Sequence, residues 1–293
     1  MRIDAFSKQH PWVNFIFFIG AIVSAVLIQH PIYLAVGIIS GAVYYLILNG
    51  LDGLKTIIRL IPLFVFLTAI NPLFNTYGET VLFEYFNRPY TFEALIYGAV
   101  IAGVFVEMLL WFGCYNAVLT SDKFTSLFGN IIPSLSLLLV MVLRLIPNFI
   151  RKAKQISSAR ASIGKGTSEN SSNKDKLNEG LLVLGALTSW AFEGNLVTSD
   201  SMKSRGYGTD KRTSFMLYKF NCTDILLLLL EIILLIFTVV FGNMKATFTP
   251  DFYIAKIGGL NAIGFASYAI YLLIPTILNI KEAVQWHFSI SKI

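Results

Sequence analysis

Apolar runs long enough to cross a lipid bilayer recur along this chain, and they limit its possible folds more than any other feature. A membrane-spanning helix needs about 20 mostly apolar residues. Only 14% of the residues are charged, against about 25% in an ordinary soluble domain. Six runs qualify: Pro11–Ile28, Pro31–Leu51, Thr56–Phe74, Phe92–Leu119, Cys222–Gly242 and Tyr253–Ile280. The sequence therefore predicts an all-α polytopic membrane protein.

Small residues recur at four-residue spacing inside these runs, and in lipid this spacing lets two helix backbones approach closely. The pairs are Gly37 with Gly41, Gly98 with Ala102, and Ala99 with Gly103. The connections at Gln29–Pro31 and Asn49–Gly53 are short, so the helices that they join should be antiparallel neighbours. The pattern predicts a packed bundle and indicates no chemistry.

Basic residues between the apolar runs indicate which side of the membrane each loop faces. The segments Phe124–Ile150 and Leu181–Val197 are nearly apolar enough to span, but the stretch between them, Arg151–Gly180, is strongly basic. If Phe124–Ile150 crossed the bilayer, this loop would face outward and break the positive-inside rule. We therefore expect Ser121–Asn221 and both chain termini to be cytoplasmic, with an eight-span arrangement as the alternative.

This topology divides the chain into an N-terminal membrane part with four helices (1–120), a cytoplasmic region (121–221) and C-terminal membrane helices (222–293). In the cytoplasmic region, Pro133 and Pro147 should kink or end a first helix. The stretch Gly164–Lys176 is typical of a flexible loop, and Gly206 and Gly208 suit a helix C-cap. Three cytoplasmic helices are expected, near Phe124–Phe149, Arg151–Ile163 and Leu177–Ser204.

These non-spanning helices are apolar on much of their surface. They need the membrane interface, another helix or a partner subunit to cover them.

Two arginines of this region lie among very small residues near predicted helix ends. The elements are Ala159-Arg160-Ala161 and Ser204-Arg205-Gly206. A guanidinium with small neighbours is accessible, and its planar fork can bind a carboxylate through two hydrogen bonds. Such an arginine suits an acidic groove on another protein. The alternative is that both complement their helix dipoles or anionic lipid.

Ionisable residues inside apolar helices are costly and are therefore functional candidates. They are Glu107, Arg144, Glu193 and Glu231. Glu107 and Glu231 are the two that lie in predicted spans, where they could form a proton or cation path in a secondary transporter. The alternative is a buried hydrogen bond or a helix-packing contact.

Two proline-containing segments are interpreted as bends or ends of helices. Arg144 with Pro147 marks the point where the first cytoplasmic helix bends away from the membrane. Asn71 and Pro72 mark the end of the third span.

Several function classes lack their sequence signals. Gly164-Lys165-Gly166 is not a phosphate-binding loop, because position 159 is not glycine and the residue after Lys165 is not Ser or Thr. The chain has no nucleophile–base pair or metal-ligand cluster of known spacing, so no cofactor or metal is expected in it. The basic residues sit between apolar runs, which argues against nucleic acid as a partner.

Three stretches together resemble the transmembrane T component of energy-coupling factor (ECF) transporters, the cobalt- and vitamin-uptake branch of ABC importers. They are Asn71-Pro72-Leu73-Phe74-Asn75, Leu143-Arg144-Leu145-Ile146-Pro147 and Ser201-Met202-Lys203-Ser204-Arg205-Gly206-Tyr207-Gly208. The resemblance covers nearly the whole chain, and its most specific part is Arg205-Gly206-Tyr207-Gly208.

The resemblance implies an L-shaped scaffold in the plasma membrane with two kinds of partner. Its spans would contact a membrane-embedded S component that captures a vitamin or metal ion. Its cytoplasmic coupling helices would insert Arg160 and Arg205 into grooves of two ATP-binding cassette ATPases, which bind the ATP. Ala161 stands where the family usually has Gly or Ser, and Ser204 where it has Ala, but both arginines are retained. A polytopic membrane enzyme is a third possibility that no sequence feature favours.

Overall fold

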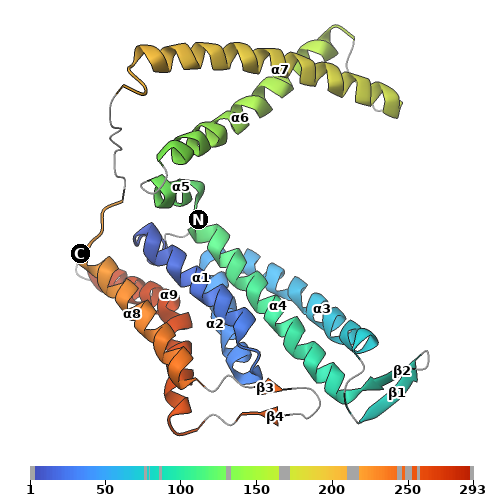
Figure 1. The fold of residues 1–293 in the computed structure, drawn as a ribbon, viewed down its shortest axis with the longest axis vertical. Coiled ribbons are helices and arrows are strands. Elements are labelled where there is room, and N and C mark those ends of the chain that lie inside the picture. Colours follow the sequence, from blue (N-terminus) through green and yellow to red (C-terminus); the bar gives the residue numbers. More distant parts are fainter. Residues whose placement is uncertain are drawn as a thin grey trace. The chain divides into compact units, whose positions relative to one another are not determined.

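The computed structural model describes residues 4–75, 78, 80–85, 88–129, 133–164, 172–209, 218–242, 246–247, 253–255 and 258–290. It divides into two compact units. Unit 1 comprises Met1–Phe124 and Tyr218–Ile293, and unit 2 comprises Thr125–Leu217. Figure 1 labels their helices and strands along the chain.

Unit 1 is a helix bundle whose helix starts follow from local sequence. Its helices are α1 (Pro11–Leu27), α2 (Pro31–Asn49), α3 (Leu51–Phe74), α4 (Phe92–Val118), α8 (Cys222–Phe241) and α9 (Asn261–Ile290). The side chains of His10 and His30 cap α1 and α2 by accepting the N–H groups of Trp12 and Ile32. A proline follows each histidine at the first helical position, where its missing N–H has no cost.

Helix α4 packs against α1, α2 and α3, and α9 packs against α2 and α8. The predicted small-residue contacts are present. A Cβ on Gly37 would lie 1.9 Å from Glu107 Oε1, and one on Gly98 would lie 2.9 Å from the carbonyl oxygen of Thr68. These glycines are therefore what allows α4 to approach α2 and α3 so closely.

The helix in the sixth apolar run begins later than predicted. A helix was expected over Tyr253–Ile280, but Tyr253–Ile254 is strand β4, paired with β3 (Ala246–Thr247). Helix α9 begins only at Asn261, after Gly259 adopts φ +60°. The glycines at 258 and 259 break the apolar run, which hydropathy alone does not register. A second hairpin, β1 (Val81–Tyr85) with β2 (Arg88–Thr91), precedes α4.

Six helices of the described chain are long and apolar enough to cross a membrane: α2, α3, α4, α8, residues 261–286 of α9, and α7 (Asn173–Ser204). The protein is therefore multi-pass, as predicted. This set of six helices differs from the predicted spans at two points. Helix α1 has only 17 residues and is not included, whereas α7 is long and apolar enough to be included. The mean hydropathy of α7, 1.3, is the lowest of the six.

Unit 2 contains two long helices, α6 (Pro133–Ser162) and α7, which contact and cross each other (Figure 1). The prediction of one helix near Phe124–Phe149 and another at Arg151–Ile163 was wrong. A short helix, α5 (Ser121–Gly129), comes first, and α6 then begins at Pro133 and continues through Pro147. An internal proline removes one backbone hydrogen bond, and the turns on either side of Pro147 keep theirs. Residues 165–171 of the predicted loop, including Lys165, lie outside the described residues.

Candidate partner-docking site

Arg160 lies in the last turn of α6 and is bound by a carboxylate of its own chain. Its Nε donates to Glu179 Oε1, and its Nη2 donates to Glu179 Oε2 at 2.7 Å. The two side chains are 24% and 15% exposed. Hydrogen bonding to Glu179 raises the pKa of Arg160 above its ordinary value, so the guanidinium stays charged. Arg160 therefore binds a carboxylate through two hydrogen bonds, but this carboxylate belongs to α7 of the same chain, and the expected contact with a partner protein stays a prediction.

Glu179 was not predicted from the sequence as a site residue. It belongs to α7, and only the pairing of α6 with α7 brings it to Arg160, 19 residues earlier in the chain. No spacing rule connects residues on two helices whose register is unknown. Complementary charge on two neighbouring helices is the one signal that the sequence offers, and it does not select a partner.

Aromatic contacts fix the register in which α6 and α7 meet. Phe149 and Trp190 pack edge to face with ring centroids 5.5 Å apart, and Lys152 Nζ lies 5.8 Å from the Trp190 ring centroid. Together with the Arg160–Glu179 pair, these contacts show that the helices run antiparallel where they touch. Leu187, three residues before Trp190 and therefore on the same side of α7, is buried. The position of Arg160 is therefore set by packing along more than one helical turn.

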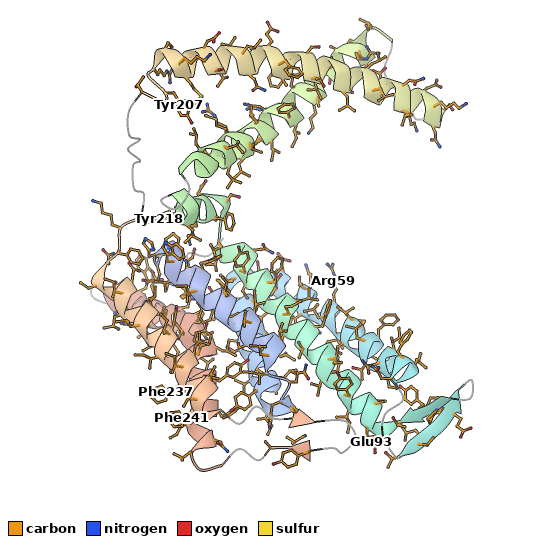
Figure 2. The ribbon with its side chains drawn as sticks, viewed as in Figure 1. Arg59, Glu93, Tyr207, Tyr218, Phe237 and Phe241 are labelled. Carbon is orange, nitrogen blue, oxygen red and sulfur yellow. The ribbon has the colours of Figure 1, made fainter. Side chains whose placement is uncertain are left out.

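Arg205 is exposed and occupies the C-cap of α7. The N–H of Tyr207 donates to Met202 O at 3.0 Å, and the N–H of Gly206 donates to Lys203 O at 3.0 Å. These are the two hydrogen bonds of a Schellman motif, which needs a left-handed residue just after the cap. Gly206 supplies it with φ +79°. The Arg-Gly-Tyr segment is therefore a helix stop that leaves the arginine exposed at its end, and Figure 2 shows Tyr207 there.

The small neighbours of both arginines are exposed, as the sequence predicts for an accessible guanidinium. Gly164 N donates to Ala161 O at 3.0 Å, which closes the end of α6, and Ser204 Oγ donates to Ser201 O at 3.0 Å. The side chain of Ala159, directly before Arg160, is only a methyl group. No side chain next to either arginine therefore blocks its approach to a partner.

The remaining candidates separate into helix ends, surface residues and buried acids. Asn75 Nδ2 donates to Asn71 Oδ1 at 3.1 Å, and α3 ends at Phe74, so the predicted helix end at Asn71 and Pro72 is confirmed. Arg144 and Pro147 lie exposed inside α6, which continues as one helix through both, and the predicted bend away from the membrane at these residues stays a prediction. Glu193 is exposed on α7.

Glu107 and Glu231 are fully buried in unit 1. Tyr268 OH donates to Glu107 Oε1 at 3.2 Å, so the interpretation of Glu107 as a buried hydrogen-bonding residue is supported. Neither oxygen of Glu231 has a hydrogen-bond partner among the described residues.

Exposed apolar side chains accompany the two arginines on unit 2. They are more than one-third exposed and include Leu138, Val142, Ile146 and Ile150 on α6, and Leu181, Leu184, Phe192 and Leu196 on α7. An apolar surface of this extent marks a site that a membrane or another protein covers. Among the described residues, no group of three or more His, Cys, Asp or Glu side chains is placed to hold a metal ion.

A multi-pass helix bundle joined to a pair of long crossing helices defines an α-helical polytopic membrane protein. A family model described as CbiQ, cobalt transport protein, matches residues 5–215. The chain belongs to this family. The match includes both arginine elements and ends before α8. A comparison with curated proteins found no match.

Proposed function

We propose that this chain is the membrane scaffold subunit, or T component, of an ECF-type ABC importer. It carries no catalysis of its own and transmits motion from two cytoplasmic ATPase domains to a membrane-embedded S component. The S component binds the micronutrient, a vitamin or a metal ion, and the ATPases bind ATP. Membership of a cobalt transport family supports the transport role.

One observation carries the proposal. Each of the two long helices of unit 2 carries an arginine flanked by small residues at its C-terminal end, and α7 stops in a Schellman motif. A guanidinium at a rigid helix end can pull or push the whole helix when a partner moves it. Closing of the ATPase pair on ATP would displace Arg160 and Arg205, and α6 and α7 would carry the displacement toward the S component.

The proposal places unit 2 and both chain termini in the cytoplasm, because that is where the ATPases are. The basic residues of α6 and α7 support this side under the positive-inside rule. Labelling of single cysteines at Lys174 and Lys176 tests it. Modification by a membrane-impermeant reagent from the outside of intact cells would contradict the topology and the proposal with it.

Charge reversal at the arginines tests the coupling role. Arg205→Glu should abolish substrate uptake and reduce the amount of ATPase that co-purifies with the chain in mild detergent, while the chain still inserts. Arg151→Glu is the matched control, because Arg151 is an exposed arginine of α6 whose Nη2 contacts only Asn148 among the described side chains. Normal uptake by Arg205→Glu would refute the proposed role.

A different experiment is needed for Arg160, because Arg160→Glu alone would place a new carboxylate beside that of Glu179. The exchange Arg160→Glu with Glu179→Arg restores the ion pair between α6 and α7 but moves the cation to the other helix. Uptake should stay lost in this double variant if Arg160 docks into a partner. Full recovery of uptake would show that Arg160 only holds α6 and α7 together.

A stand-alone secondary transporter is a second candidate. It is favoured by the buried carboxyl of Glu231, which has no hydrogen-bond partner in the part of the chain that the structure describes. It predicts proton-coupled uptake by the purified chain alone in liposomes, and loss of that uptake in Glu231→Gln. The scaffold proposal predicts no uptake by the chain alone.

A further inference from the structure

The residues before α1, Asp4–His10, form a packed segment that contacts several helices of unit 1. Asp4 Oδ2 accepts hydrogen bonds from Tyr44 OH of α2 at 2.8 Å and from the N–H of Ser7 at 2.9 Å. Asn279 of α9 donates to Asp4 Oδ1 and accepts the N–H of Ala5 at 2.9 Å. A segment that contacts both α2 and α9 in this way is part of the core.

Phe6 fixes the segment from the apolar side. Its ring is fully buried and packs edge to face on Phe17, Phe18 and Tyr44, with centroid distances of 5.1, 6.0 and 6.4 Å. Lys8 forms an ion pair with Glu282 of α9. The segment is therefore held by aromatic burial on one side and by polar contacts on the other.

The chain leaves unit 1 after Phe124, next to a lysine that this segment binds. Lys123 is only 6% exposed. Its ammonium donates to the backbone oxygen of Ser7, to Ser7 Oγ at 2.9 Å and to Val118 O at 3.1 Å. Burial lowers the pKa of Lys123, while the charge of Asp4 raises it. An ammonium with this little access to water is costly to separate from its acceptors.

The chain returns to unit 1 at Tyr218, beside the other end of the same segment. Asp224, in the first turn of α8, is 3% exposed, and its Oδ1 accepts the N–H of His10 at 3.0 Å. Its Oδ2 accepts the N–H of Asn221 at 2.9 Å. The ring of His10 stacks on Phe220 with centroids 3.6 Å apart and packs edge to face on Tyr218. Figure 2 places Tyr218 at the end of unit 1 where α8 starts, opposite to Glu93.

We propose that Asp4–His10 is a clamp, which fixes both connections of unit 2 to the membrane bundle through the positioning residues Lys123 and Asp224. One connection is held at Ser7 and the other at His10, three residues apart. With both connections fixed to one buried segment, a displacement of unit 2 is passed to α2 and α9 instead of being absorbed where the chain crosses between the units. The mechanical role rests on the proposed function, whereas the fixing of the connections does not.

The first test uses the full chain alone in lipid nanodiscs. Spin labels at exposed positions of unit 1 (Leu51→Cys) and unit 2 (Leu196→Cys), with Cys222→Ser, report the distribution of distances between the units. Lys123→Met and Asp224→Ala should each broaden this distribution at least twofold. Lys55→Met is the matched control, because Lys55 is exposed and pairs with Asp52 in its own helix. An unchanged width in either clamp variant overturns the proposal for that connection.

The second test uses the complex with the ATPases that co-purify from the native membrane. Lys123→Met should leave ATP hydrolysis within twofold of the parent and lower uptake per ATP at least fivefold, whereas a merely structural role would lower both together. An unchanged ratio of uptake to hydrolysis overturns the mechanical role. Failure of the proposed function itself has a different signature: Arg205→Glu then leaves uptake intact, whatever the clamp variants do to the distances.

Discussion

Replacing Gly206 by alanine should open the helix stop that presents Arg205. Gly206 has φ +79°, and its N–H donates to Lys203 O while its carbonyl accepts the N–H of Thr209. An L-residue with a Cβ in this left-handed region costs about 1–2 kcal/mol. The contact of the new Cβ with Thr209 Oγ1, at 3.3 Å, is a minor addition because a side chain can move. Backbone conformation therefore sets the penalty.

A penalty of about 1–2 kcal/mol changes the equilibrium between closed and open cap by a factor of about 5–30. The amide of Tyr207 reports this directly, because its hydrogen bond to Met202 O exists only while the cap is closed. In Gly206→Ala the protection of the Tyr207 amide against hydrogen exchange should fall by about 5–30-fold. Uptake should fall in parallel if the ATPase requires Arg205 on a closed cap.

Two controls separate the cap from a general effect of substitution. Asparagine tolerates the left-handed region, so Gly206→Asn should retain most of the protection. Gly194→Ala, inside α7 with open space around its Cβ position, should leave Tyr207 unchanged or slightly more protected, since alanine favours helix. Protection in Gly206→Ala within twofold of the parent would show that the Schellman geometry does not hold Arg205 in place.

Two further substitutions test helix packing and the arginine pair. Gly37→Ala should destabilise unit 1 by about 1–3 kcal/mol in reversible unfolding, because its Cβ would lie 1.9 Å from Glu107 Oε1 and would displace a buried carboxyl from its hydrogen bond with Tyr268. Gly185→Ala, with no atom near its Cβ position, should be neutral or stabilising by up to about 1 kcal/mol, and equal effects of the two would contradict the packing. Glu179→Gln removes the carboxylate that competes for Arg160, so more ATPase should co-purify with the chain; a clear loss would mean instead that Glu179 orients Arg160 for docking.

Local signals in the sequence were enough to place most of unit 1. Apolar runs that begin at Pro11 and Pro31 predicted the starts of α1 and α2, and long apolar runs define α3, α4 and α8; the histidine cap before each proline was found only in the structure. The start of α9 was missed because the residues around Tyr253 are as apolar as a helix, and only the glycines at 258 and 259 separate them from it. Hydropathy measures the transfer of side chains into lipid and contains no information on backbone conformation.

Contacts between distant segments were beyond sequence reasoning. Glu107 was identified as a candidate for a buried hydrogen bond, but its donor, Tyr268, lies 161 residues away. The Arg160–Glu179 pair and the clamp have the same origin, since each depends on the register of helices that only packing determines. Pro147 was expected to kink or end a helix, but α6 continues through it. The one backbone hydrogen bond that the proline removes is small beside the remaining bonds of a 30-residue helix.

The two arginines differ in what docking would cost them. Arg205 is exposed on a backbone cap and gives up only water when it meets a carboxylate on a partner. Arg160 must first leave Glu179, so its docking is an exchange of one bidentate pair for another and its net gain is smaller. Under the proposed function, Arg205 would therefore supply most of the binding energy, and Arg160 would contribute less because it must first be released from Glu179. Arg205→Glu should accordingly weaken ATPase binding more than the Arg160 and Glu179 exchange does.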